Sequence, residues 1–216
     1  MSNDLQLRAD IEAELEFEPS LTAAGIGVAV KDGVATLTGN VPSYFEKFEA
    51  ERAAGRVRGV RAIAEELEVK LPFDVKHDDA EIARRASNIL EWGSFPSVKA
   101  DHVKVTKGWV TLSGEVEWQY QREAATNSVR HLAGVIGVTN LITIRPHVMI
   151  GDVKDHIAKA FQRNAQLESS GIRVSVEGGK VSLSGNIKTW RDRRTAENAA
   201  WGMASVTQVV DNLVVN

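Results

Sequence analysis

Residues 103–114 read VKVTKGWVTLSG, and two similar stretches occur in the chain: VAVKDGVATLTG at residues 28–39 and VSVEGGKVSLSG at residues 174–185. Each copy alternates apolar and polar residues, passes through a pair containing glycine, alternates again and ends on a glycine. Alternation on both sides of a two-residue turn is typical of a β-hairpin. The repeat therefore predicts three copies of one fold, and by itself it indicates no reaction.

Glycines mark the turn and the end of each predicted hairpin. The turn glycines are Gly33, Gly108 and Gly179, and the closing glycines are Gly39, Gly114 and Gly185. Glycine takes a positive φ at no steric cost, as tight turns often require. Alternation then assigns one strand face to the core. The predicted core positions are Val28, Val30, Ala35, Leu37, Val103, Val105, Val110, Leu112, Val174, Val176, Val181 and Leu183.

A helix is predicted after each hairpin. Ser43 with Glu46, and Thr189 with Asp192, have the spacing of a capping box, in which side chains satisfy free backbone N–H groups at a helix start. Trp118 stands at the matching position of the second copy, so we expect that helix to be less well capped. Small apolar residues then recur on one helical stripe: Ala50, Ala53, Ala54 and Val57; Ala125, Ser128, Val129 and Leu132; Ala196, Ala199, Ala200 and Met203.

A third strand is predicted after this helix, and another amphipathic helix before each hairpin. The third strand carries Leu67 and Val69, Leu141 and Thr143, or Leu213 and Val215. The first helix carries apolar residues at steps of four: Leu7, Ile11 and Leu15; Ile82, Ala86 and Leu90; Val153, Ile157 and Phe161. The fold class is therefore α+β. We expect three tandem α-β-β-α-β units at residues 1–71, 76–145 and 148–216.

Composition indicates a soluble globular protein. The chain has 216 residues, of which 43% are hydrophobic and 25% charged, with a net charge of −3 and no cysteine. Disulfide and thiolate chemistry are thereby excluded, and the charge gives no general case for nucleic-acid binding. The first residues lack the pattern of a signal peptide, and no stretch approaches the roughly 20 apolar residues of a membrane-spanning helix. We therefore expect a cytoplasmic protein, peripheral to the membrane if it contacts one, with the periplasm as the alternative.

The repeated pattern resembles a known family. The motif V-x-V-x-x-G-x-V-x-L-[ST]-G, the alanine-striped helix and the Gly-Val steps at residues 59–60 and 134–135 are similar to the BON domain, named for bacterial osmotically induced and nodulation proteins. The resemblance implies a three-stranded mixed sheet with two helices on one face. It also implies a non-enzymatic, transport-associated role, either association with phospholipid membranes or envelope integrity under osmotic stress. Two departures are Ser205 in place of a helix-ending glycine, and a step into the third strand, Val135 to Leu141, that is one residue shorter than in the other copies.

No catalytic, cofactor or metal site is predicted. The histidines are His77, His102, His131, His147 and His156, and none forms an HxxxH or HxH pair. Asp78, Asp79, Asp152 and Asp155 open predicted helices, where carboxylates favour the helix dipole. The glycines follow hairpin turns, so they do not form a phosphate-binding loop. We therefore expect a protein that is not an enzyme.

Two surfaces are candidate contact sites. Basic and aromatic residues crowd the start of the last predicted helix: Lys188, Trp190, Arg191, Arg193 and Arg194. With Trp201, two turns or more further along the helix, they suit a lipid headgroup or an acidic partner. The alternative is that Trp190 caps the core edge while the arginines are merely solvated. A second set falls on the outer sheet face by alternation, and it predicts cover by a neighbouring unit or another chain: Trp109, Ile142, Ile144 and Val214. The alternative there is scattered exposed hydrophobic residues.

The sequence thus predicts a non-catalytic binding or scaffold protein, related to stress or the envelope, that recognises anionic phospholipid surfaces or protein partners. One alternative is a homo-oligomeric assembly that encloses a passage for small solutes. Another is a sensor of a small ligand or ion, which needs a polar pocket that the sequence does not display.

Overall fold

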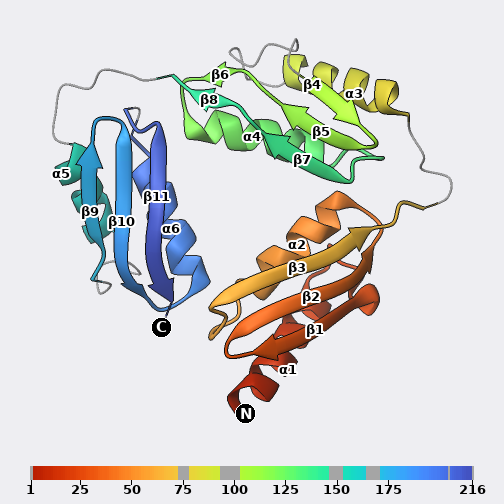
Figure 1. Cartoon of the computed structure of the whole chain (residues 1–216), viewed down its shortest axis with the longest axis horizontal. Helices are drawn as coiled ribbons and strands as arrows, with labels where there is room; N and C mark the ends of the chain where they lie inside the picture. Colours follow the sequence, from red (N-terminus) through yellow and green to blue (C-terminus); the bar gives the residue numbers. More distant parts are fainter. Residues whose placement is uncertain are drawn as a thin grey trace.

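The computed structural model describes residues 2–72, 78–92, 103–145, 153–163, 171–203 and 205–215. Three hydrophobic cores lie in them, one for each repeat, and the repeats are called unit 1 (2–72), unit 2 (78–145) and unit 3 (153–215). Figure 1 shows each unit as a small sheet with its two helices on one face. The predicted α+β class and the three tandem sandwiches are confirmed.

The same element order recurs in all three units. Unit 1 contains α1 (Ser2–Phe17), a short 3-10 turn (Ala23–Gly25), β1 (Ile26–Lys31), β2 (Val34–Val41), α2 (Tyr44–Ala54) and β3 (Ala62–Val69). Unit 2 contains α3 (Asp79–Trp92), β4 (Val103–Thr106), β5 (Trp109–Leu112), β6 (Glu115–Val116), α4 (Gln119–Arg130), β7 (Gly137–Asn140) and β8 (Thr143–Ile144). Unit 3 contains α5 (Val153–Gln162), β9 (Arg173–Glu177), β10 (Lys180–Ile187), α6 (Trp190–Trp201) and β11 (Gln208–Val215).

Each sheet is mixed, with the second strand of the hairpin at its centre. The strand orders are β1-β2-β3, β4-β5-β7 and β11-β10-β9, and the short β6-β8 pair continues the sheet of unit 2. The hairpin strands pair antiparallel and the third strand joins parallel, as a crossover through the second helix allows. The predicted core face is confirmed, with Ala35, Leu37, Val110, Leu112, Val181 and Leu183 all buried.

The closing glycines are required by close backbone approach. Gly39 has a φ of 116°, and a Cβ atom built there would lie 2.1 Å from the carbonyl oxygen of Gly25. Gly185 has a φ of 132°, and its Cβ would lie 2.5 Å from the carbonyl oxygen of Gly171. A side chain at either position would both strain the backbone and overlap a neighbouring strand end.

The first helix of units 1 and 2 also fastens the hairpin turn. Both oxygens of the Asp79 carboxylate accept hydrogen bonds from the turn, at 2.7 Å from the Lys107 amide and 2.8 Å from the Gly108 amide. Asp4 does the same in unit 1, at 3.0 and 3.2 Å. The turn residue Lys107 has a φ of 52°, which a non-glycine side chain rarely adopts, and the carboxylate stabilises this conformation.

The predicted helix caps are confirmed where the sequence has Ser or Thr. Ser43 Oγ accepts from the Glu46 amide at 3.2 Å, and Thr189 forms a two-way capping box with Asp192. In unit 2, where Trp118 lacks an acceptor, Gln121 Oε1 accepts from two amide groups ahead of the helix, each at 3.0 Å. Gln121, the third residue of α4, therefore contributes one half of a capping box. The expected lack of a side-chain acceptor at Trp118 is confirmed, but the helix start still has a side-chain hydrogen-bond partner.

The predicted third strand of unit 2 was wrong by one residue. Ile142 and Ile144 are 2% and 8% exposed and belong to the core, whereas Leu141 is 58% exposed. The step from Val135 to Ile142 equals those from Val60 to Leu67 and from Val206 to Leu213, so no shortening exists. The sequence alone favours Leu141 as the residue equivalent to Leu67 and Leu213, but in the structure the core-facing residue at that position is Ile142.

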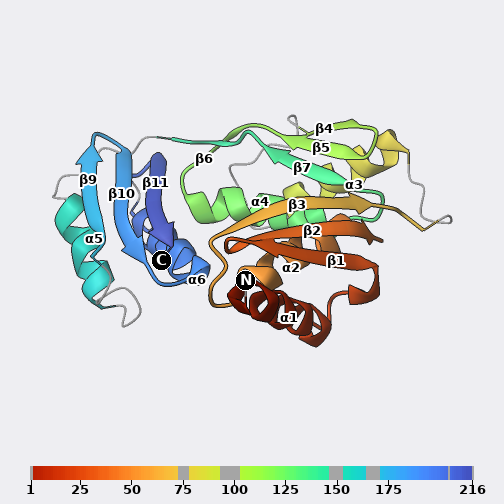
Figure 2. The same ribbon diagram turned by 60° about the horizontal axis from the view of Figure 1, so that its bottom comes forward.

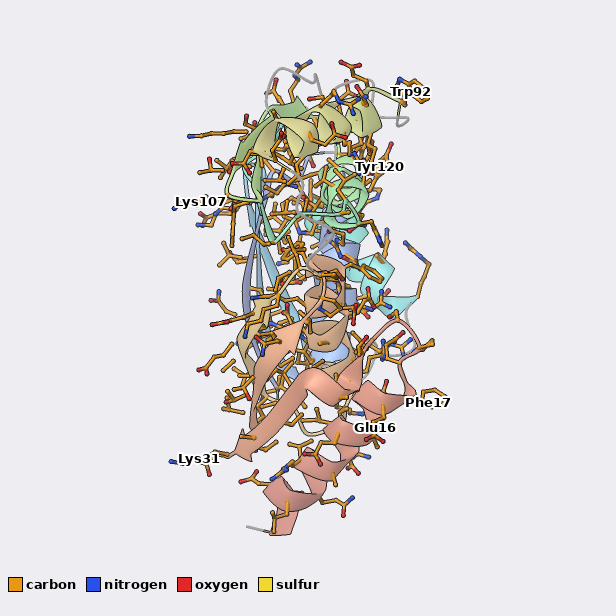
Figure 3. The ribbon with its side chains drawn as sticks, turned by 90° about the vertical axis from the view of Figure 1, so that its right-hand side faces the viewer. Glu16, Phe17, Lys31, Trp92, Lys107 and Tyr120 are labelled. Carbon is orange, nitrogen blue, oxygen red and sulfur yellow. The ribbon has the colours of Figure 1, made fainter. Side chains whose placement is uncertain are left out.

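The three second helices lie where the units meet. Figures 1 and 2 show α2, α4 and α6 turned toward the middle of the molecule. In Figure 3, Lys31 and Lys107 of the hairpins project from one side, and Phe17, Trp92 and Tyr120 from the helices project from the opposite side. Within the described ranges, each helix is too short or too polar to cross a bilayer.

Candidate functional site

Aromatic and basic side chains join unit 1 to unit 2. The rings of Phe45 and His131 have centroids 4.3 Å apart, and the guanidinium carbon of Arg130 lies 3.6 Å from the centroid of the Phe48 ring. Tyr44 packs against the core of unit 2. The first two turns of α2 thus contact the C-terminal end of α4. Burial lowers the pKa of the Arg130 guanidinium there.

Trp201 joins unit 2 to unit 3. Its half-buried side chain packs against the cores of both units. An open cleft of about 560 Å³ lies beside it between α4 and α6. The cleft is lined by Trp118, Gln119, Tyr120, Glu123, Asn198, Trp201 and Gly202. Trp201 therefore serves packing between units, which leaves less of its surface for an external partner.

A second cleft separates unit 1 from unit 3. It has a volume of about 740 Å³ and lies between α2 and α6. Trp190 reaches across it, since a Cβ atom on Gly55 would lie 2.9 Å from its ring. Arg194 also reaches toward unit 1, with its guanidinium carbon 5.8 Å from the Phe48 centroid. The lining residues are Phe48, Glu51, Arg52, Gly55, Arg56, Trp190, Arg191, Arg193, Arg194, Glu197 and Asp211.

The structure divides the basic cluster predicted at the start of α6. Trp190 packs against the core of unit 3, and Arg193 forms an ion pair with Asp211 while lying 4.8 Å above the Trp190 ring. Lys188, Arg191 and Arg194 are exposed, and none of the three has a carboxylate within ion-pair distance in the described parts of the chain. Half of the predicted cluster thus supports the fold, and half is free to meet a partner.

A group of polar contacts, called the polar triad, recurs in each unit between the second helix and the third strand. In unit 1, Lys47 lies 3.0 Å from the Glu65 carboxylate and donates to the Leu67 carbonyl at 2.6 Å. Glu65 also accepts from the Leu67 amide at 2.6 Å. The triad therefore ties the second helix to the third strand at the point where the strand backbone is not paired.

Units 2 and 3 build the same triad from different side chains. In unit 2, Asn140 accepts from the Ile142 amide at 2.9 Å and donates to Thr126 at 2.7 Å, so no carboxylate is present. In unit 3, Asp211 accepts from the Leu213 amide at 2.8 Å and pairs with Arg193. Units 1 and 3 each hold two carboxylates at this place, Glu51 with Glu65 and Glu197 with Asp211. Unit 2 holds the neutral side chains of Thr126 and Asn140 there.

The paired carboxylates bind protons more readily than isolated ones. Burial, followed by the nearby charge of Asp211 and a hydrogen bond with it, raises the pKa of Glu197 to about 7. Burial and the charge of Glu65 raise the pKa of Glu51. Arg194 opposes both shifts. Because Glu197 lines the α2–α6 cleft, the charge of the cleft depends on pH near neutrality.

The predicted outer-face cluster is only partly assembled. Trp109 is 47% exposed and Val214 is 56% exposed, both on the outer faces as predicted, but the placement of Ile142 and Ile144 there is wrong. Among the described residues, the Trp109 side chain lies exposed. Its indole N–H donates to Thr139 at 2.8 Å, and its ring lies over the backbone of Gly137. An interface through Trp109 and Val214 stays a prediction.

The acidic and histidine side chains that the structure describes form no metal-binding group. Among the described residues, no set of three or more has the arrangement to hold a metal ion. His131 packs on Phe45, whereas His77, His102, His147 and Asp152 lie outside the described residues.

Sequence reasoning missed the contribution of α2 to the cleft. Phe48, Glu51 and Arg52 carry no motif, and contacts between units leave no periodic signal. The triad could have been found, because Lys47, Arg122 and Arg193 occupy matched positions in the three copies, as do Glu65, Asn140 and Asp211. Comparing the repeats for polar as well as apolar positions would have shown it.

Comparison with known proteins gives matches along the chain. The BON domain model matches residues 3–70, 78–146 and 151–216. Osmotically-inducible protein Y of Escherichia coli (strain K12) is 30% identical over 148 residues, which cover 64% of this chain and 71% of that protein.

Two solved structures are also similar. Both are of CdsD, a structural protein of the type III secretion system of Chlamydia trachomatis. One is 17% identical with a TM-score of 0.24, covering 98% of this chain and 92% of that one. The other, the C-terminal domain, is 16% identical with a TM-score of 0.27, covering 98% of each.

Proposed function

Because the chain belongs to the BON domain family through all three of its units, we propose that it is a non-catalytic binding protein that associates peripherally with anionic phospholipid surfaces. The contact is the basic surface at the start of α6, defined as Lys188, Arg191 and Arg194. The name of the Escherichia coli relative supports a role of this kind under osmotic stress.

The observation that carries the proposal is the exposure of three cations at a helix N-terminus. Positive charge there opposes the helix dipole, so the cluster does not stabilise α6. The chain as a whole carries a net charge of −3, so attraction to an anionic surface must come from a local group of cations such as this one. Each such cation near an anionic bilayer contributes about 1 kcal/mol.

Binding of this type is electrostatic and reversible. Three cations supply on the order of 3 kcal/mol, which gives weak association that salt screens. Part of Trp190 lies at the same helix start, where its ring is held by the core of unit 3. The protein would therefore reside on the surface of the bilayer without inserting a segment.

Vesicle flotation tests the proposal. The full chain is mixed with vesicles of phosphatidylcholine alone, or of phosphatidylcholine and phosphatidylglycerol in equal amounts, at low and physiological salt. We expect flotation only with the anionic vesicles, reduced by salt. The variant Lys188→Glu/Arg191→Glu/Arg194→Glu should lose it.

A matched control changes the same charge elsewhere. Lys31, Lys104 and Lys180 are exposed on the hairpins of the three units, so Lys31→Glu/Lys104→Glu/Lys180→Glu removes as many cations from the sheet side. This variant should float as the parent protein does. Equal loss of flotation in both variants would mean that only net charge matters, and no flotation of the parent protein would reject the proposal.

A further inference from the structure

The α2–α6 cleft has the size of a ligand site. Its volume of about 740 Å³ lies within the roughly 300–1,000 Å³ that small-molecule sites occupy. Its walls come from two units that are far apart in sequence, and sites between domains are common places for ligands. Figure 1 shows the two helices on the facing sides of units 1 and 3.

Two aromatic rings line the cleft, and both are held in place. Trp190 is fixed by the core of unit 3 and by contact with Gly55, where only a glycine leaves room for its ring. Phe48 is fixed by Arg130 of unit 2, whose guanidinium covers it at 3.6 Å. An apolar or aromatic ligand therefore meets surfaces that are already ordered, which lowers the entropic cost of binding.

Five arginines line the same cleft, and their pairing is unequal. Three of them are neutralised by carboxylates: Arg52 by Glu49, Arg56 by Glu14 and Glu18, and Arg193 by Asp211. Arg191 and Arg194 have no such partner within ion-pair distance among the described residues. The cleft thus offers two guanidinium groups, which bind carboxylate and related anions through paired hydrogen bonds.

We propose that the α2–α6 cleft binds a small organic anion with an aromatic body. The ring packs against Phe48 and Trp190, and the anionic group, a carboxylate or sulfonate, is held by Arg191 and Arg194. Charge complementarity selects the anion, and the two rings select the body. This proposal shares Arg191 and Arg194 with the lipid contact, but its ligand is a single soluble molecule held between two units.

The acids of the cleft make binding depend on pH. Glu197 faces Asp211 on β11 and Arg193 and Arg194 on its own helix, and Glu51 of α2 lines the same space. Protonation of Glu197 removes one negative charge from the cleft. Affinity for an anion should therefore be several-fold higher at pH 6 than at pH 8.

Titration of the full chain with 2-naphthoate tests the proposal. The readout is the indole N–H signal of Trp190 in a two-dimensional ¹⁵N NMR spectrum, identified from its loss in Trp190→Phe. We expect a saturable shift of that signal. The neutral analogue 2-naphthylmethanol lacks the anionic group, and inorganic phosphate lacks the aromatic ring. Both should therefore bind at least tenfold more weakly than 2-naphthoate.

Two variants locate the anion contact. Arg191→Gln and Arg194→Gln change exposed side chains, and an unchanged amide spectrum outside the cleft will show that they fold. Each should weaken 2-naphthoate binding by about tenfold, as expected when a charge-assisted contact is lost. Lys31→Gln should leave it unchanged.

Three results would overturn the proposal: no saturable shift at Trp190, binding of 2-naphthylmethanol as tight as that of 2-naphthoate, or unchanged affinity in both arginine variants. Phosphate binding as tight as that of 2-naphthoate would also reject it, since the rings would then contribute nothing. Vesicle flotation and this titration are separate measurements, so either proposal can fail without the other.

Discussion

The guanidinium carbon of Arg130 in unit 2 lies 3.6 Å from the centroid of the Phe48 ring in unit 1. The same ring has Arg194 of unit 3 at 5.8 Å. Phe48 is thus the one side chain in the described residues with cation–ring contacts from both other units. Because it contacts both other units, this ring limits how the units rotate against one another.

Phe48→Ala should loosen the arrangement of units without unfolding them. A partly buried cation–ring contact contributes about 1–2 kcal/mol, and one ring serves two of them. We expect a larger radius of gyration by small-angle X-ray scattering and faster proteolysis near residues 72–78. The far-ultraviolet circular dichroism should not change. The control is Phe17→Ala, a phenylalanine that is 82% exposed, and an unchanged scattering curve for Phe48→Ala would contradict the assignment.

The repeat letters were enough to predict the fold, because glycines with positive φ and alternating apolar residues are set by local backbone geometry. They also predicted the core, apart from the third strand of unit 2. That error arose because residues 141–144 read LITI, so an apolar residue lies on each of the two strand faces. Alternation cannot choose a face there, whereas the position of Asn140 in the polar triad does.

The candidate site was less accessible to sequence reasoning. The cations at the start of α6 could be predicted from the sequence. Phe48 could not, because Glu123 and Arg194 occupy its position in the other copies, so comparing the repeats predicts no shared role for this position. Its role arises only from packing between units. Contacts of that kind depend on the relative placement of three folded bodies, which local patterns do not encode.

Trp109 should stabilise unit 2 from its outer face. Its ring covers the backbone at Gly137, and its N–H bonds to Thr139, so Trp109→Asp should lower the free energy of unfolding by about 1–2 kcal/mol. Thermal unfolding measures this effect. Size-exclusion chromatography of the same variant tests self-association: a shift to a smaller apparent size would identify the outer face as an interface.

Val214→Asp is the control for that experiment, because Val214 is 56% exposed on the outer face of unit 3 and its side chain has no hydrogen bond to lose. It should leave the melting temperature nearly unchanged. Equal destabilisation by the two variants would show that an acidic side chain on either outer face lowers stability. The contacts of Trp109 with Gly137 and Thr139 would then not account for the effect of Trp109→Asp.

Asp79 should stabilise the hairpin turn of unit 2. Removing its carboxylate in Asp79→Ala leaves the amides of Lys107 and Gly108 without their acceptor, at a cost of about 1 kcal/mol for a solvent-accessible site. Hydrogen exchange of these two amides should accelerate. Asp4→Ala serves as the internal comparison, since it should accelerate exchange at Asp32 and Gly33 only. Unchanged exchange at both turns would contradict the assignment.

Glu197 should make the stability of unit 3 depend on pH. The pKa of this carboxyl is raised from 4.5 to about 7 in the folded chain, so the folded state binds a proton more tightly than the unfolded state does. The resulting stabilisation is complete below pH 4.5, declines as the pH rises, and is lost above about pH 7. Glu197→Gln keeps the neutral shape at every pH. It should therefore raise the melting temperature of the chain at pH 8 and change it little at pH 5.

The size of this effect is set by partial exposure. Solvent screening reduces the full shift to a gain of about 1 kcal/mol at pH 8, or a few degrees for a unit of this size. Asn198→Gln, an uncharged change on the next, exposed position of α6, is the control and should behave alike at both pH values. If Glu197→Gln instead lowers stability at pH 8, then the attraction of Arg193 and Arg194 for the ionised carboxylate outweighs burial and the repulsion from Asp211, and the direction of the pKa shift is reversed.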